Sequence, residues 1–211
     1  FNTGEQLAVF VIAGNGHLTL NELSVNGEGI KATHFISSDS SGPSNHYNLF
    51  VTNCGIRNLS KQNGCENIFY AYKSMIADSV VVRNNLFANN TASSILMAEE
   101  KDDKGYYNAE KIIIGHNHFN QQTGVLLNVY RGGNDESTMG PQLFFSHNKI
   151  TDCNTTDGSP LISLTGVQVT SIFSNQFTGS NATKPLVLYK DTVRAKHSFE
   201  KNILTQSGNI E

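Results

Sequence analysis

A short cassette that recurs along the chain constrains its fold more than any other feature. Residues 111–119 read Lys-Ile-Ile-Ile-Gly-His-Asn-His-Phe, so three β-branched residues run into a polar corner and an asparagine stands two places before a large apolar residue. Further copies lie at 79–87, 143–150, 171–177 and 197–204, and looser copies without the asparagine lie at 18–25 and 49–56. The apolar residues that close the copies are Val25, Ile56, Phe87, Phe119, Ile150, Phe177 and Leu204.

The intervals between these closing residues are 31, 31, 32, 31, 27 and 27 residues. A period in this range indicates stacked units that bury their apolar faces against their neighbours. Each interval also holds a second short apolar run, and no long segment shows helical periodicity. These features predict an all-β fold, a right-handed parallel β-helix built as a single-stranded solenoid of about seven coils. Leucine-rich repeats are shorter and propeller blades are longer, so both fit less well.

The recurrent asparagine has a physical role in this prediction. Asparagine tolerates tight corners, and its amide can form hydrogen bonds with the same residue one coil above and one coil below. We therefore expect the asparagines to stack along the solenoid.

Length and charge narrow the possible partners. The 211 residues form one domain, 1–211, because an elongated solenoid can hold them around one core. The net charge is −3 with no basic block, so we expect no nucleic-acid partner. No apolar run approaches the ~20 residues that span a bilayer. Leu7–Ile12 already has a strand pattern with no capping segment before it, and we expect a longer chain on the N-terminal side.

The cysteines leave two alternatives open. Cys54, Cys65 and Cys153 are too few and too irregularly spaced for a disulfide framework or a zinc site. Cys54 and Cys65 could pair with each other, or each cysteine could pack inside its own coil.

Two polar segments depart from the coil pattern. Residues 99–110 hold clustered carboxylates, which suit either a calcium- or sugar-binding loop or a solvated turn. In 130–141, Arg131 stands beside an aromatic residue and a Gly-Gly pair, so it could hold a sugar carboxylate or form an ion pair within its own loop. The candidate residues for contact with a substrate or a partner domain are Asp102, Asp103, Tyr107, Asn108, Tyr130, Arg131, Asp135 and Glu136.

With this coil pattern, the segments 100–110, 130–141 and 166–170 resemble polysaccharide lyase family 6, which contains alginate lyases and chondroitinase B. The resemblance is to the C-terminal domain of the two-domain alginate lyases. It implies β-elimination in which calcium offsets the uronate carboxylate, a lysine removes the C5 proton and an arginine protonates the leaving oxygen. The resemblance places this apparatus in an N-terminal β-helix domain, where the lysine belongs to a Lys-Ser pair and the arginine to an Arg-His-Gly sequence.

The catalytic roles do not transfer to this chain. Lys73-Ser74 matches the first element, but one coil later residues 92–98 contain no Arg-His-Gly. We therefore assign no catalytic and no metal-binding residue here, and Lys73 is interpreted as an ordinary surface residue.

The resemblance implies a C-terminal β-helix domain of a secreted, periplasmic or cell-surface bacterial lyase. Its expected partners are an acidic polysaccharide (alginate first, or dermatan sulfate), the N-terminal catalytic domain and a second copy of the chain. The domain would support the catalytic domain, its groove or dimerisation. The alternatives are a non-catalytic carbohydrate-binding or adhesin-like β-helix, a chondroitinase B-type lyase, and an independent lyase with an unfamiliar site. The sequence leaves open endo or exo cleavage and the preference for mannuronate or guluronate.

Overall fold

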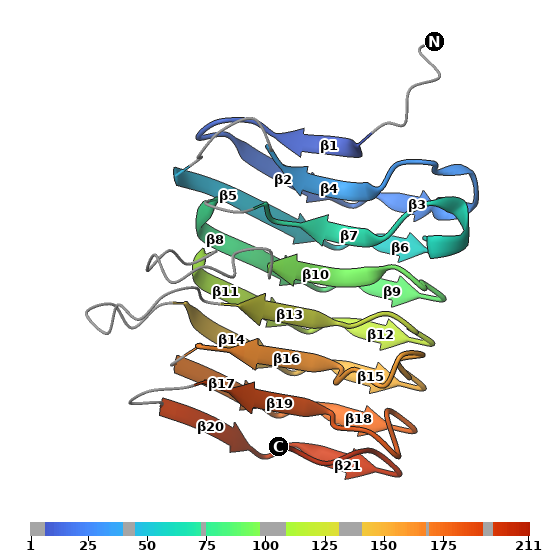
Figure 1. Ribbon diagram of the computed structural model, residues 1–211, viewed down its shortest axis with the longest axis vertical. Helices are drawn as coiled ribbons and strands as arrows, with labels where there is room; N and C mark the ends of the chain where they lie inside the picture. Colours follow the sequence, from blue (N-terminus) through green and yellow to red (C-terminus); the bar gives the residue numbers. More distant parts are fainter. Residues whose placement is uncertain are drawn as a thin grey trace.

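The computed structural model is a parallel β-helix, so the predicted fold class is confirmed. It describes residues 7–39, 45–72, 75–97, 109–130, 141–167, 169–191 and 196–211. Three parallel sheets of seven strands each run the length of the molecule, and every coil contributes one strand to each sheet. Figure 1 shows the strands stacked from β1 at the N-terminal end to β21 at the C-terminal end.

The strands are named here by sheet. Sheet A consists of β1 (Ala8–Ile12), β4 (His34–Ser38), β7 (Asn67–Tyr70), β10 (Ser93–Met97), β13 (Leu127–Tyr130), β16 (Ile162–Thr165) and β19 (Val187–Lys190). Sheet B consists of β2 (His17–Asn21), β5 (Asn45–Thr52), β8 (Ile76–Arg83), β11 (Ala109–Gly115), β14 (Gln142–Ser146), β17 (Val169–Phe173) and β20 (Lys196–Glu200). Sheet C consists of β3 (Ser24–Asn26), β6 (Gly55–Arg57), β9 (Leu86–Ala88), β12 (His118–Asn120), β15 (Lys149–Thr151), β18 (Gln176–Thr178) and β21 (Ile203–Thr205). Two short 3-10 helices, η1 (Gly27–Gly29) and η2 (Lys61–Asn63), lie on connections from sheet C to sheet A.

The register of sheet C confirms the repeat that the sequence predicts. Each closing apolar residue of the cassette is the direct partner of the next one, from Val25 opposite Ile56 to Phe177 opposite Leu204. Within this column the rings of Phe87 and Phe119 are stacked, with centroids 4.9 Å apart. The cassette therefore determines which residues face each other across neighbouring coils.

The turn from sheet B to sheet C, which we call the B–C corner, has the same construction in every coil. Two residues separate the strands, and the first of them has a left-handed backbone, as in His116 with φ 57° and His147 with φ 55°. The second residue is an asparagine in five successive coils, and its side chain points into the molecule. These residues are Asn85, Asn117, Asn148, Asn175 and Asn202.

The asparagines form the predicted ladder. Asn117 Nδ2 donates to Asn148 Oδ1 at 3.0 Å, and Asn148 Nδ2 donates to Asn175 Oδ1 at 3.0 Å. The same Asn117 amide donates to the Val82 carbonyl at 2.9 Å. The ladder satisfies corner backbone groups that would otherwise be buried without partners, which is costly in an apolar interior.

The three cysteines are buried free thiols, which resolves the alternative between a Cys54–Cys65 bridge and cysteines packed in their own coils in favour of the second. Burial raises the pKa of the Cys65 thiol to about 11 and that of the Cys153 thiol to about 12. These thiols pack as small apolar groups. In the described part of the chain, no helix has the length and apolar character needed to cross a membrane.

Candidate functional site

The side of the molecule where the chain passes from sheet A to sheet B, which we call the A–B edge, differs from the uniform B–C corner. Its connections vary in length: three residues separate β16 from β17, and eleven separate β10 from β11. Because the strands are held by stacking, such connections can differ from coil to coil without changing the core. Side chains on such connections are available for a function other than stacking.

By their position in the chain, both polar segments identified in the sequence belong to connections between sheet A and sheet B. Asp102, Asp103, Tyr107 and Asn108 come between β10 and β11 and lie outside the described residues. Arg131, Asp135 and Glu136 come between β13 and β14 and also lie outside them.

Among the predicted site residues, Tyr130 is the one that the structure describes. It is the half-buried last residue of β13 and lies opposite Thr165 of β16. Lys73, which the sequence assigns to the surface, falls in another undescribed part of the same edge. The roles of these residues remain predictions.

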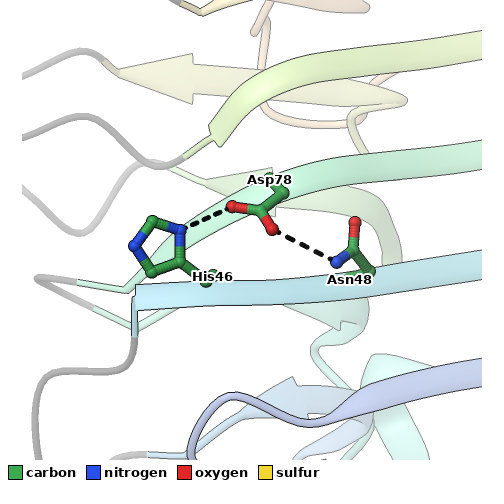
Figure 2. A network of polar contacts seen from close by, with 3 residues as sticks. All are labelled: His46, Asn48 and Asp78. Atoms are coloured by element: carbon green, nitrogen blue, oxygen red, sulfur yellow. Dashed lines mark hydrogen bonds and ion pairs between the residues drawn. The ribbon is translucent and has the colours of Figure 1, made fainter.

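The described residues of the A–B edge include a histidine held by a carboxylate (Figure 2). His46 Nδ1 lies 2.9 Å from Asp78 Oδ1, and Asn48 Nδ2 donates to Asp78 Oδ2 at 3.5 Å. The second ring nitrogen of His46 points away from Asp78. The carboxylate thus orients the imidazole and leaves Nε2 for another partner.

The backbone around this histidine is irregular. The pairing of β5 with β8 shifts register between Asn45 and Tyr47 and again between Tyr47 and Asn48. His46 itself has φ 69°, which is uncommon for a residue other than glycine. Such irregularities re-aim side chains and are frequent beside functional sites.

The exposure of the pair limits its contribution to stability. The His46 side chain is 71% exposed and that of Asp78 is 39% exposed. An ion pair this exposed contributes only about 0–1 kcal/mol to stability. The oriented imidazole is well placed for chemistry instead: it can exchange a proton with a sugar hydroxyl, or pair with a carboxylate when it is protonated.

A second polar group lies on sheet A, on the neighbouring strands β4 and β7 and the two residues that follow β7. The rings of His34 and Tyr70 are stacked with centroids 4.4 Å apart, and the Tyr72 ring lies 4.8 Å from that of Tyr70. Asn67 Nδ2 lies 3.2 Å from His34 Nδ1, and Tyr72 Oη lies 3.4 Å from His34 Nε2. Asn67 Nδ2 can only donate, so His34 Nδ1 is the acceptor of this hydrogen bond.

This aromatic group joins the second and third coils on sheet A, because His34 begins β4 while Tyr70 ends β7 and Tyr72 follows it. His34 is buried, whereas Tyr70 and Tyr72 are half-buried. Aromatic faces with a few convergent polar groups are typical of the surfaces that hold organic ligands.

Calcium, which the family resemblance implies, does not find a site in the described part of the chain. Calcium takes six to eight oxygen ligands. Among the residues that the structure describes, no group of three or more His, Cys, Asp or Glu side chains is placed to hold a metal ion. No chemical step on this chain is therefore derived through calcium.

The sequence analysis missed both the His46–Asp78 pair and the aromatic group. One signal could have found the pair: His46 and Asp78 are 32 residues apart, which is one coil. Polar residues one coil apart can meet across neighbouring coils, as the asparagines of the cassette do.

Comparison with solved structures finds a likeness over nearly the whole chain. A mutant form of the PL6 family alginate lyase AlyGC superimposes with a TM-score of 0.74 at 21% identity and covers 95% of this chain. Another structure of AlyGC gives a TM-score of 0.62 at 17% identity and covers 97%. These proteins share one fold.

The chain spans only 31% and 40% of the lengths of those two structures. No protein-family model and no curated protein matches the sequence. At this level of identity the likeness establishes the parallel β-helix of PL6 family alginate lyases and leaves the activity to be tested.

Proposed function

We propose that this chain is one β-helical domain of a longer polysaccharide lyase that acts on a uronate-containing polymer, with alginate as the first choice. The observation that carries the proposal is the superposition on alginate lyase structures over 95% of this chain but only 31% of theirs. A stacked β-helix presents long regular faces, which suits an extended polymer.

The proposed role is to support the catalytic domain, to wall one end of its groove or to mediate dimerisation. The lysine and arginine that perform β-elimination, with calcium, belong in this proposal to the N-terminal domain. A polymeric substrate implies a secreted, periplasmic or cell-surface protein. Dermatan sulfate is the alternative substrate, because it carries the same uronate carboxylate.

The test compares this chain with the longer chain proposed to contain it. Each is incubated with alginate and with dermatan sulfate in calcium buffer, and the absorbance of the unsaturated uronate product is followed. We expect product from alginate with the longer chain and none with this chain alone. Activity of neither protein on either polymer would refute the lyase assignment.

The variants Arg131→Ala and Asp135→Ala in the longer chain test the predicted loop. We expect loss of activity, stability or assembly if this loop faces the substrate or the partner domain. Unchanged behaviour in all three measurements would remove the loop from the proposal.

One observation favours a second candidate function, a proton-transfer site on this chain itself. The His46 imidazole is oriented by Asp78 and exposed at the A–B edge, as a general base or acid requires. If this chain alone cleaves the polymer, His46→Gln and Asp78→Asn should lower kcat by about 100-fold or more. The exposed His17→Gln serves as the matched control, and equal losses in both histidine variants would exclude a specific role for His46.

A further inference from the structure

The B–C corner of the middle coils carries basic side chains and no carboxylate. The chain as a whole is acidic, with 18 Asp and Glu against 15 Lys and Arg. In contrast, the parts of sheets B and C next to the B–C corner contain no carboxylate in the five middle coils, whereas Asp78 and Glu110 lie toward the A–B end of sheet B. The segments without a carboxylate are 48–59, 79–90, 111–122, 142–151 and 169–180.

Two cationic side chains and three imidazoles gather at the B–C corner of the third, fourth and fifth coils. We call the group the basic corner and define it as Arg83, His116, His118, His147 and Lys149. Arg83 ends β8, and Lys149 begins β15. All are exposed except His118, which is half-buried.

The side chains of the basic corner lie on neighbouring coils. The rings of His116 and His147 are stacked, with centroids 4.8 Å apart and an angle of 8° between planes. His118 and Lys149 are direct partners of β12 and β15. Arg83 is the direct partner of Gly115, the residue that precedes His116.

The acids on the strands of this group lie away from the corner, because Asp78 is toward the A–B end of β8 and Glu110 is toward the same end of β11. Burial lowers the pKa of His118, and the positive charge of the Lys149 ammonium lowers it further. The acids nearest in the coil pattern are Asp152, which follows β15 on the turn away from the corner, and Glu200 of β20. Like charges on neighbouring strands are mildly unfavourable, and soluble surfaces normally intersperse both signs. A one-sign surface on an acidic protein favours an anionic ligand.

The repeat of the fold suits a polymer. Neighbouring strands are about 4.8 Å apart, so the basic corner presents Arg83, the His116 and His118 imidazoles, and Lys149 on three successive coils. A polyuronate carries one carboxylate per sugar and can follow such a row. The A–B edge lies on the far side of sheet B, roughly 20 Å away for a seven-residue strand.

We propose that the basic corner binds a carboxylate-bearing polysaccharide at a position separate from the A–B edge, and so holds the polymer on the outside of the solenoid. The substrate class rests on the proposed function, whereas the location rests on the charge distribution. Arg83 and Lys149 supply the fixed charges, and the stacked histidines supply donors to carboxylates and hydroxyls.

The test measures binding of alginate to this chain by titration calorimetry at low ionic strength. Arg83→Gln combined with Lys149→Gln should weaken binding about fivefold, which corresponds to about 1 kcal/mol for the two exposed charges together. The matched control, Lys31→Gln combined with Lys61→Gln, removes the same charge from exposed positions of the first two coils and should change binding less than twofold. Melting temperatures of both variants should equal that of the wild type, because the altered side chains are exposed.

Three results would overturn the inference. Wild-type affinity in the Arg83/Lys149 variant would remove the site, and equal losses in both double variants would show a general charge effect. Binding of single-stranded DNA as tightly as alginate would refute the polysaccharide class.

The outcomes separate this inference from the lyase proposal. If the longer chain cleaves alginate while the Arg83/Lys149 variant binds it normally, the basic corner fails and the lyase assignment stands. If no form cleaves alginate but the wild type binds it through the basic corner, the lyase assignment fails and the basic corner stands.

Discussion

The B–C corner and the A–B edge belong to the same coils but follow different rules. At the corner every connection has two residues and a left-handed first residue, and an interior amide ladder joins five coils. At the edge the connections range from three to eleven residues, and the described polar contacts pair particular residues of particular coils. The corner maintains the stack, while the edge is free to carry chemistry.

An insertion should show the difference most strongly. Two glycines inserted between His147 and Asn148 would displace Asn148 from the ladder and shift the later coils, so we expect loss of cooperative folding or at least about 4 kcal/mol of stability. The same insertion after Asp191, at the A–B edge, should cost less than about 1 kcal/mol because loop closure depends weakly on length. Urea denaturation measures both. Similar losses in the two variants would contradict the division.

A single amide tests the ladder itself. Asn117→Ala removes a buried side chain that accepts from Asn85 Nδ2 at 3.0 Å and donates to Asn148 and to the Val82 carbonyl. We expect a loss of about 3–5 kcal/mol, because several buried groups are left without partners. The control is Asn48→Ala at the A–B edge, where the side chain meets Asp78 at 3.5 Å, and there we expect less than about 1 kcal/mol. Thermal and urea unfolding should rank the two variants in this order.

A substitution of Tyr47 should stabilise the protein, unlike the two changes above. Tyr47 lies beside His46 in the irregular start of β5, and its buried hydroxyl has no hydrogen-bond partner among the described residues. Burial raises the pKa of this phenol far above its ordinary value. Tyr47→Phe should therefore increase the free energy of unfolding by about 1 kcal/mol. Phe145→Tyr in the regular core is the matched reverse change and should be destabilising. A loss of stability in Tyr47→Phe would show that the hydroxyl has a partner.

The smallest expected effect is electrostatic and concerns the corner surface. Burial and Lys149 both favour the neutral form of His118, so its folded pKa lies below the ordinary value. Lys149→Gln should raise that pKa by part of the shift, as followed by NMR titration of the imidazole. Because its pKa is lower in the folded state, His118 lowers the free energy of unfolding as the pH falls below the ordinary histidine pKa. Lys149→Gln should reduce this loss of stability at acid pH. No change in the titration would mean that burial alone causes the shift.

Much of the fold could be predicted because the information repeats. The closing apolar residues from Val25 to Leu204 are spaced by one coil, and they became direct partners in sheet C. The asparagines were predicted to stack and do so. The site was less predictable. The structure describes Tyr130 among the predicted site residues, and the contacts of His46 and His34 were not anticipated.

The sequence by itself determined the stacked architecture, the register of sheet C and the interior amide ladder. These follow from short-range patterns, because a strand needs only its own apolar alternation and a neighbour of the same length. The tertiary structure alone decided that His46 meets Asp78 and that Arg83, His116, His147 and Lys149 share one surface without carboxylates. The reason is that polar surface contacts depend on how many residues each connection inserts between strands, and those lengths differ from coil to coil.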